Sequence, residues 1–176
     1  MLVEANIEEA RWTAIGLEAL AERASCAALV HLGHDPAHFE ISLLACDDAR
    51  IRALNAAFRG QDKPTNVLSW PACDLAPAQE GEAPDPPLPG APDAPEALGD
   101  IAIAFDTCAR EAAQQGKALE DHAAHLVVHS VLHLLGFDHM REGDARLMET
   151  SETEILAKLG IADPYAEGSA APDGVA

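Results

Sequence analysis

Three histidines that could hold a metal ion lie within residues 129–139, which read HSVLHLLGFDH. His129 and His133 are one helical turn apart, so on a helix they share a face, with Cβ atoms roughly 5–6 Å apart. Gly136 can adopt the left-handed conformation that ends a helix, and the chain can then turn back with His139. Three protein ligands leave one position for water or substrate, as in catalytic zinc sites. We therefore predict a metal site formed by His129, His133 and His139.

A single histidine on an apolar helix is usually a hydrogen-bonded core residue. Three imidazoles buried together without compensation would be costly, however, and this favours metal binding. Zinc, at one ion per chain, is the default because imidazole suits it and because it accepts three ligands plus water. Ligand type alone leaves nickel, copper and iron open.

Two further polar side chains lie close to the three histidines. His125 is one turn before His129, and Asp138 adjoins His139. Both are candidates for orienting a ligand imidazole or for proton transfer. The alternatives are a hydrogen-bonded helix histidine for His125 and a turn-capping carboxylate for Asp138.

Arg59 opens a polar loop, residues 59–66, between a predicted helix and a predicted strand. An arginine in the last turn of a helix is ordinarily explained by the helix dipole. Beside a metal-activated water, its guanidinium would stabilise charge on a phosphate, which suits phosphodiester cleavage. Arg59, His129 and His133 are therefore the predicted catalytic residues. The histidine spacing also matches metzincin peptidases, but Ser130 stands where those enzymes place their glutamate base.

Composition limits the class of protein. A chain of 176 residues is typical of one domain with a real core. Its four cysteines show no metal or disulfide spacing, which indicates reduced thiols in the cytoplasm. Neither a signal peptide nor an apolar run of about 18 residues is visible, so no membrane association is predicted. The net charge of −19 opposes a large nucleic-acid surface, and the densest basic group is Arg50, Arg52, Arg59 and Lys63.

Apolar periodicity predicts the main elements. Strands are expected at 39–45, 66–70 and 98–105, and helices at 10–31, 118–135 and 142–159. Asp47 and Asp106 are the predicted caps of two further helices that end near Gly60 and Gly116. The helix 118–135 is apolar on nearly every side, so it should be central and buried.

Residues 72–97 differ in kind, because they hold seven of the twelve prolines and almost no large apolar groups. Such a segment cannot offset its ordering entropy by burial, so we predict a mobile, Pro-rich acidic insertion. A tolerated insertion is a simpler explanation than a binding motif. The rest of 1–165 is predicted to be a single domain, and 166–176 a disordered tail.

Three separated stretches resemble the YbeY family of bacterial rRNA maturation factors. They are residues 129–139, residues 54–71 (LNAAFRGQDKPTNVLSWP) and residues 98–104 (LGDIAIA). The closing stretch 152–165 (ETEILAKLGIADPY) also fits that family. The resemblance implies an α+β fold, with helices packed on a four-stranded mixed sheet and the ligand helix central.

The same resemblance implies a function. It is that of a single-strand-specific, zinc-dependent endoribonuclease that acts in 16S rRNA 3′-end maturation and in ribosome quality control. Zinc would be held by His129, His133 and His139, and Arg59 would be the functional arginine. The implied partners are the single-stranded 16S rRNA precursor, the small ribosomal subunit and assembly factors. Two alternatives stay open: a non-catalytic ribosome assembly factor with a structural metal, and another zinc hydrolase.

Overall fold

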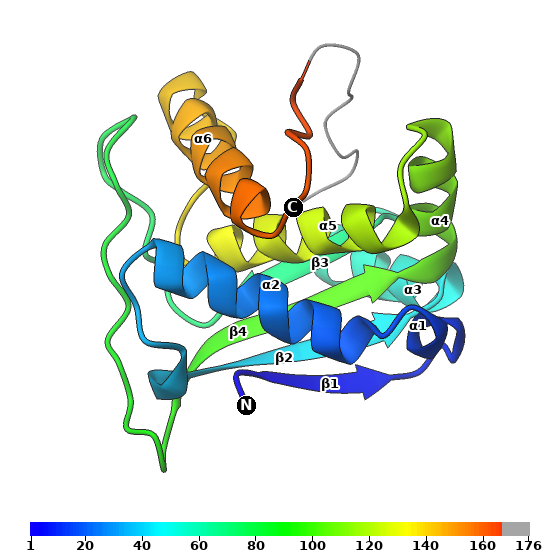
Figure 1. Cartoon of the computed structure of the whole chain (residues 1–176), viewed down its shortest axis with the longest axis horizontal. Coiled ribbons are helices and arrows are strands. Elements are labelled where there is room, and N and C mark those ends of the chain that lie inside the picture. The colour runs from blue at the N-terminus through cyan, green and yellow to red at the C-terminus, as the bar shows by residue number, and fades with distance from the viewer. Residues whose placement is uncertain (167–176) are drawn as a thin grey trace.

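Four strands form one mixed sheet in the computed structural model, which describes residues 1–166 (Figure 1). The strands are β1 (Val3–Ile7), β2 (Phe39–Cys46), β3 (Val67–Pro71) and β4 (Glu96–Ala104), in the order β1-β2-β4-β3. β1 and β4 both pair with β2 in parallel, whereas β3 runs antiparallel to β4. The sheet is therefore mixed, as predicted.

Helices cover the two faces of this sheet unequally. They are α1 (Arg11–Ala14), α2 (Leu17–His31), α3 (Asp48–Arg59), α4 (Phe105–Gln114), α5 (Leu119–Leu134) and α6 (Glu142–Lys158), with a short 3-10 turn, η1, at Pro36–His38. α2 and α5 pack side by side on one face, and α6 lies over α5 (Figure 1). α3 covers only part of the opposite face, through Ile51 and Leu54. The predicted α+β class is confirmed.

The ligand helix α5 is the centre of the larger core. Every residue from His122 to Leu134 is buried, because α5 is enclosed by α2, α4, α6 and the sheet. Each fully buried leucine or valine contributes roughly 1.5–3 kcal/mol relative to exposure. Side chains on such a helix are held in place by packing on all sides, so α5 is a rigid platform for ligands.

Two sequence-based predictions about helix ends were wrong. The predicted helix 10–31 is two helices, separated at Gly16, whose φ of +65° turns the chain out of the helical path. Asp106 is not the cap of α4, which begins at Phe105 without a local side-chain cap. Instead, Asp48 at the start of α3 accepts hydrogen bonds from the Thr107 backbone N–H at 3.0 Å and from its hydroxyl at 2.8 Å.

The acidic insertion contains almost no regular structure. Its last two residues start β4, and residues 72–95 hold only turns and an isolated bridge between Ala91 and Ala94. Near its far end, Gly90 N–H donates to the His38 carbonyl at 3.1 Å, which ties the segment to η1. Its mobility stays a prediction. The predicted tail lies outside the described residues, except for Ala166.

Within the described range, no helix is both long enough and apolar enough to cross a bilayer.

Candidate metal centre and cleft

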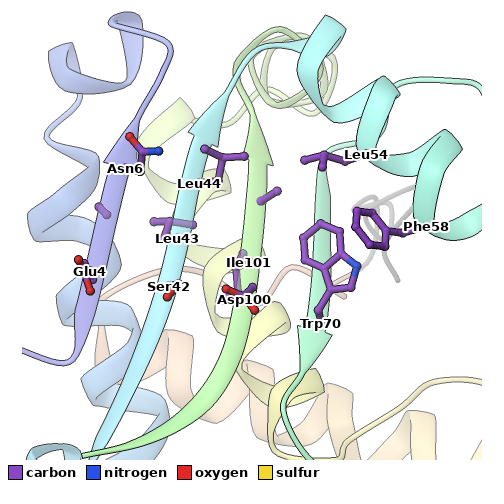
Figure 2. A pocket seen from close by; sticks show the side chains of 12 residues that line it. Glu4, Asn6, Ser42, Leu43, Leu44, Leu54, Phe58, Trp70, Asp100 and Ile101 are labelled. Carbon is purple, nitrogen blue, oxygen red and sulfur yellow. The ribbon is translucent and has the colours of Figure 1, made fainter.

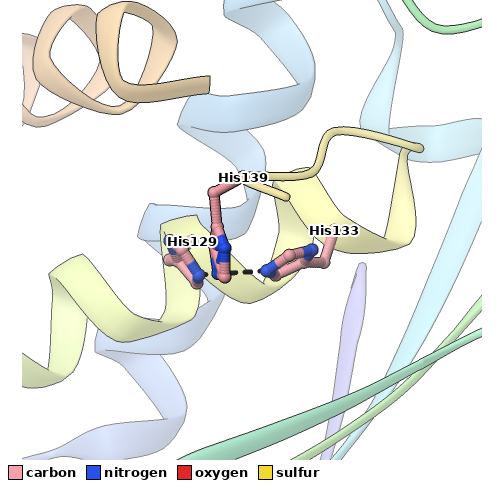
Figure 3. A group of neighbouring side chains, drawn as sticks. All are labelled: His129, His133 and His139. Atoms are coloured by element: carbon pink, nitrogen blue, oxygen red, sulfur yellow. Dashed lines mark hydrogen bonds between the residues drawn. The ribbon is translucent and has the colours of Figure 1, made fainter. Parts of the chain in front are cut away.

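The imidazoles of His129, His133 and His139 converge (Figure 3). One ring nitrogen from each lies within 4.8 Å of the others. His129 and His133 project from one face of α5, and His139 reaches over from the turn that follows (Figure 3). Among residues 1–166, no fourth histidine, cysteine or carboxylate joins this group. The three residues predicted from spacing are therefore brought together, and the group has an open side.

The two helix histidines make their hydrogen bonds to carbonyl or carboxylate oxygens through Nδ1, so it is Nε2 of each ring that faces the histidine group. His133 Nδ1 donates to the Phe137 carbonyl at 3.0 Å, and His129 Nδ1 donates to the Glu152 carboxylate. Because a neutral imidazole carries one proton, each Nε2 is then an acceptor. The two Nε2 atoms lie 3.0 Å apart, so with both rings neutral their lone pairs would repel each other, whereas a proton on one ring would make the contact a hydrogen bond. A shared cation removes that repulsion, so this donor set fits a metal ion.

His133 stays neutral over a wide pH range. Burial, followed by the neighbouring imidazoles of His129 and His139, lowers the pKa of His133 to about 3. A neutral imidazole is the form that binds a metal ion.

Glu152 on α6 is a buried carboxylate behind His129, and sequence reasoning missed it. Its side chain is fully buried and accepts hydrogen bonds from His129 Nδ1 and, at 3.0 Å, from His125 Nε2. Burial alone would raise the pKa of Glu152, but these hydrogen bonds and nearby charges outweigh it and lower the pKa to about 2. Glu152 is therefore ionised. It faces Nδ1 of His129, on the opposite side of the ring from the metal-facing Nε2.

Tyr165 completes the hydrogen bonds of Glu152. It follows α6, and its hydroxyl donates to the same carboxylate oxygen as His125. Burial and then the Glu152 charge raise the pKa of Tyr165 well above its usual value, so the hydroxyl keeps its proton. His125, a predicted partner of the site, is thus linked to His129 by hydrogen bonds through Glu152 and by an edge-to-face ring contact, with centroids 6.4 Å apart.

The turn that carries His139 is organised differently from α5. Gly136 has a φ of +97°, as the predicted helix end required, and Phe137 N–H donates to the Leu132 carbonyl at 3.0 Å. Asp138 accepts a hydrogen bond from the His139 backbone N–H at 2.7 Å. That contact is the turn-capping alternative considered for Asp138. His139 itself is exposed, whereas His129 and His133 are buried.

Arg59 and His133 line the same cleft, which has a volume of about 470 Å³. The insertion forms one wall with Cys73, Asp74 and Leu75, and the ligand turn contributes residues 136–138. Within the described part of the chain Arg59 has no ion-pair partner, unlike Arg52 on the same helix, which pairs with Asp62 at 2.9 Å. An unpaired guanidinium and an imidazole of the histidine group therefore face one hollow, although Arg59 and His133 are distant in sequence.

A second hollow, of about 600 Å³, lies on the sheet face that α3 leaves open (Figure 2). Its polar lining is Glu4, Asn6, Ser42 and Asp100, beside Phe58 and Trp70. Each hollow is lined by two carboxylates, Glu4 and Asp100 here and Asp74 and Asp138 in the cleft beside the histidines, but only that cleft also has a basic side chain, Arg59, to offset them. Of these two hollows, only the cleft beside the histidines suits an anionic substrate.

Sequence comparisons place these features in a known family. The family model described as "Endoribonuclease YbeY" matches residues 3–160. A protein named Endoribonuclease YbeY from Dinoroseobacter shibae is 59% identical over 93% of this chain and 90% of its own length. The protein of the same name from Cereibacter sphaeroides is 57% identical over 93% of this chain and 98% of its own length.

A solved structure supports the fold. The solution structure of TM1509 from Thermotoga maritima superposes with a TM-score of 0.53, at 18% identity, over 98% of this chain and 99% of the other. The family model and the relatives agree: this chain belongs to the YbeY family.

Proposed function

We propose that this protein is a zinc-dependent endoribonuclease that cleaves single-stranded RNA in maturation of the 16S rRNA 3′ end and in ribosome quality control. The observation that carries the proposal is the shared cleft, in which the unpaired Arg59 and His133 of the histidine group line the same hollow. The names of the relatives, which are endoribonucleases, agree with this chemistry.

The residues of the cleft have separate tasks. His129, His133 and His139 would hold the ion through their ring nitrogens. When bound, zinc supplies a Lewis acid that activates water and polarises a phosphoryl oxygen. Arg59 would bind a non-bridging phosphate oxygen through its fork of N–H donors and stabilise the charge that develops during cleavage.

The substrate class follows from the shape and charge of the cleft. His129 and His133 are only 3% and 8% exposed, so a scissile phosphate has to enter a recess, and an unpaired strand bends into a recess more readily than a duplex. Few basic groups are free to bind the backbone, since Arg50 pairs with Glu8 and Arg52 with Asp62. RNA binding should therefore be weak on its own. Docking on the small ribosomal subunit and assembly factors would supply the remaining binding free energy. The cytoplasm is the matching compartment, and the four free cysteines agree with it.

The direct test is an RNase assay on a precursor with an unprocessed 16S rRNA 3′ end. We expect the purified protein to cleave it, a chelator to stop cleavage and added zinc to restore it. His129→Ala, prepared identically, controls for contaminating nucleases and should be inactive. Equal cleavage by wild type and His129→Ala would refute the proposal.

Arg59→Lys tests the phosphate contact. Lysine keeps the charge but loses the bidentate geometry, so we expect cleavage to fall by roughly tenfold or more while zinc affinity is unchanged. Unchanged cleavage of single-stranded RNA would remove Arg59 from the mechanism.

The two alternatives make different predictions. A peptidase needs a base beside the open side of the ion, but Ser130 is buried and Glu152 lies behind His129. Casein should therefore stay intact in a parallel assay. A structural metal would be needed for folding, whereas α5 is enclosed by apolar packing without it. After chelation, circular dichroism should show a retained fold, and the RNase assay should show lost cleavage. Collapse of the fold would favour the structural role.

A further inference from the structure

The third ligand lacks the kind of support that holds the other two. The rings of His129 and His133 are fixed by hydrogen bonds to Glu152 and to the Phe137 carbonyl. Among the described residues, the His139 ring makes no hydrogen bond and only contacts the other two rings, with centroids 5.5 Å from His129 and 5.2 Å from His133. The position of His139 therefore depends on the backbone of the turn between α5 and α6.

The acidic insertion holds the far end of that turn. Arg141 donates to the carbonyls of Pro77, at 3.1 Å, and Ala78, at 3.4 Å. Asp144 accepts a hydrogen bond from Gly81 N–H at 2.8 Å. Arg141 and Asp144 also pair with each other, with Nε and Oδ2 2.6 Å apart. Three backbone groups of the insertion are thereby tied to the start of α6, immediately after His139.

The near end of the turn is in close contact with the same insertion. A Cβ atom added to Gly136 would lie 2.7 Å from the carbonyl carbon and oxygen of Leu75. At Gly143 an added Cβ would lie 2.9 Å from Glu80 Cγ and 3.3 Å from Gly81. The two backbones therefore touch on both sides of His139, and glycine is what allows the approach.

We propose that residues 75–81 of the insertion are a brace for the metal site, and that Arg141 and Asp144 are positioning residues that fix His139 through it. The inference rests on the metal site of the proposed function. Its physical basis is entropic: a ligand on an unbraced turn must be ordered when the ion binds, whereas a braced turn is ordered beforehand. A tolerated insertion, the simpler reading of its composition, would have no effect on the ion.

Arg141→Ala tests the brace, with Arg146→Ala as the matched control. Arg146 lies in α6, which Arg141 immediately precedes, and it pairs only with Glu142, at 3.3 Å. We expect Arg141→Ala to weaken zinc binding about tenfold in competition with a chromophoric chelator, within the range known for residues that orient ligands. Arg146→Ala should match wild type, and Arg141→Lys, which keeps the charge but has one donor nitrogen in place of three, should recover part of the loss. Wild-type zinc affinity in a folded Arg141→Ala protein would overturn the proposal.

A second measurement needs no variant. Because coupling is reciprocal, zinc should stabilise the brace by the factor by which the brace stabilises zinc. We therefore expect zinc to slow hydrogen exchange of the Gly81 amide in the wild-type protein about tenfold, with no comparable change at the Gly90 amide, which is bonded to His38. Equal hydrogen-exchange rates of the Gly81 amide with and without zinc would contradict the proposed brace. Failure of the wild type to bind zinc at all would instead refute the proposed function.

Discussion

Helix α5 and the turn that follows it position their histidines in different ways. On α5, His129 and His133 are placed by a helix that is buried on all sides, and their spare ring nitrogens are bonded to Glu152 and Phe137. On the turn, His139 is exposed, and the nearby side chains of Arg141 and Asp144 are hydrogen-bonded to the backbone of an irregular acidic segment. The difference teaches that converging side chains can be positioned in two ways, by packing within a buried helix or by contacts between an exposed turn and a distant loop.

Removing a helix ligand should have the largest effect. His133→Ala deletes one of the two Nε2 atoms that face each other at 3.0 Å, so we expect zinc retention and RNA cleavage to be abolished. Elemental analysis after gel filtration measures the bound zinc, with His34→Ala, outside the site, as control. Near-stoichiometric zinc in His133→Ala would show that the ligand assignment is wrong.

Removing the carboxylate that accepts from His129 should have an intermediate effect on zinc affinity. Glu152→Gln removes the charge that accepts from His129 and His125 while keeping the side-chain shape, so we expect zinc affinity to fall roughly 10- to 100-fold. Glu154→Gln is the control, because Glu154 lies on the same helix but is exposed and pairs with His31. If both variants bind zinc alike, Glu152 does not orient His129.

Straining the turn should weaken zinc binding less than Glu152→Gln does, but it should also lower the free energy of unfolding. Gly136→Ala places a side chain at a φ of +97° and against Leu75, so we expect roughly 1–3 kcal/mol of destabilisation and about tenfold weaker zinc binding. Gly160→Ala is the matched control, since its φ is +76° but no atom lies within 4 Å of the added Cβ. Denaturant unfolding of the apo protein and chelator competition measure the two effects. An equal loss of zinc affinity in both variants would mean that contact with the insertion is irrelevant.

The sequence predicted that the three histidines would converge because they are close together along the chain. Three histidines around a helix-ending glycine are a local pattern, and a helix apolar on every side has to be buried. The sequence also contained an indication of Glu152 that was not used. Glu152 is four residues after Met148 and three before Ile155, which are both buried, so it lies on the apolar stripe of α6. A carboxylate at such a position needs buried partners.

Other features depend on contacts between distant segments, which local patterns do not contain. The cap of α4 comes from Asp48 on α3, so the local candidate, Asp106, was the wrong aspartate. β1 was not predicted, although Val3, Ala5 and Ile7 alternate with Glu4 and Asn6; the run is only five residues long, and its pairing with β2 is a contact between distant segments. The composition of the insertion correctly indicated irregular backbone, but it carries no information on where that backbone lies.

The contact between Tyr165 and Glu152 has a consequence for translation. Tyr165 is added 13 residues after Glu152 and later than every histidine of the site. A product truncated at Gly160 would contain all three ligands and Arg59, yet it would lack the phenol that donates to the buried carboxylate. Residues 161–165 therefore add the hydrogen bond of Tyr165 to a carboxylate that also accepts from His129 and His125.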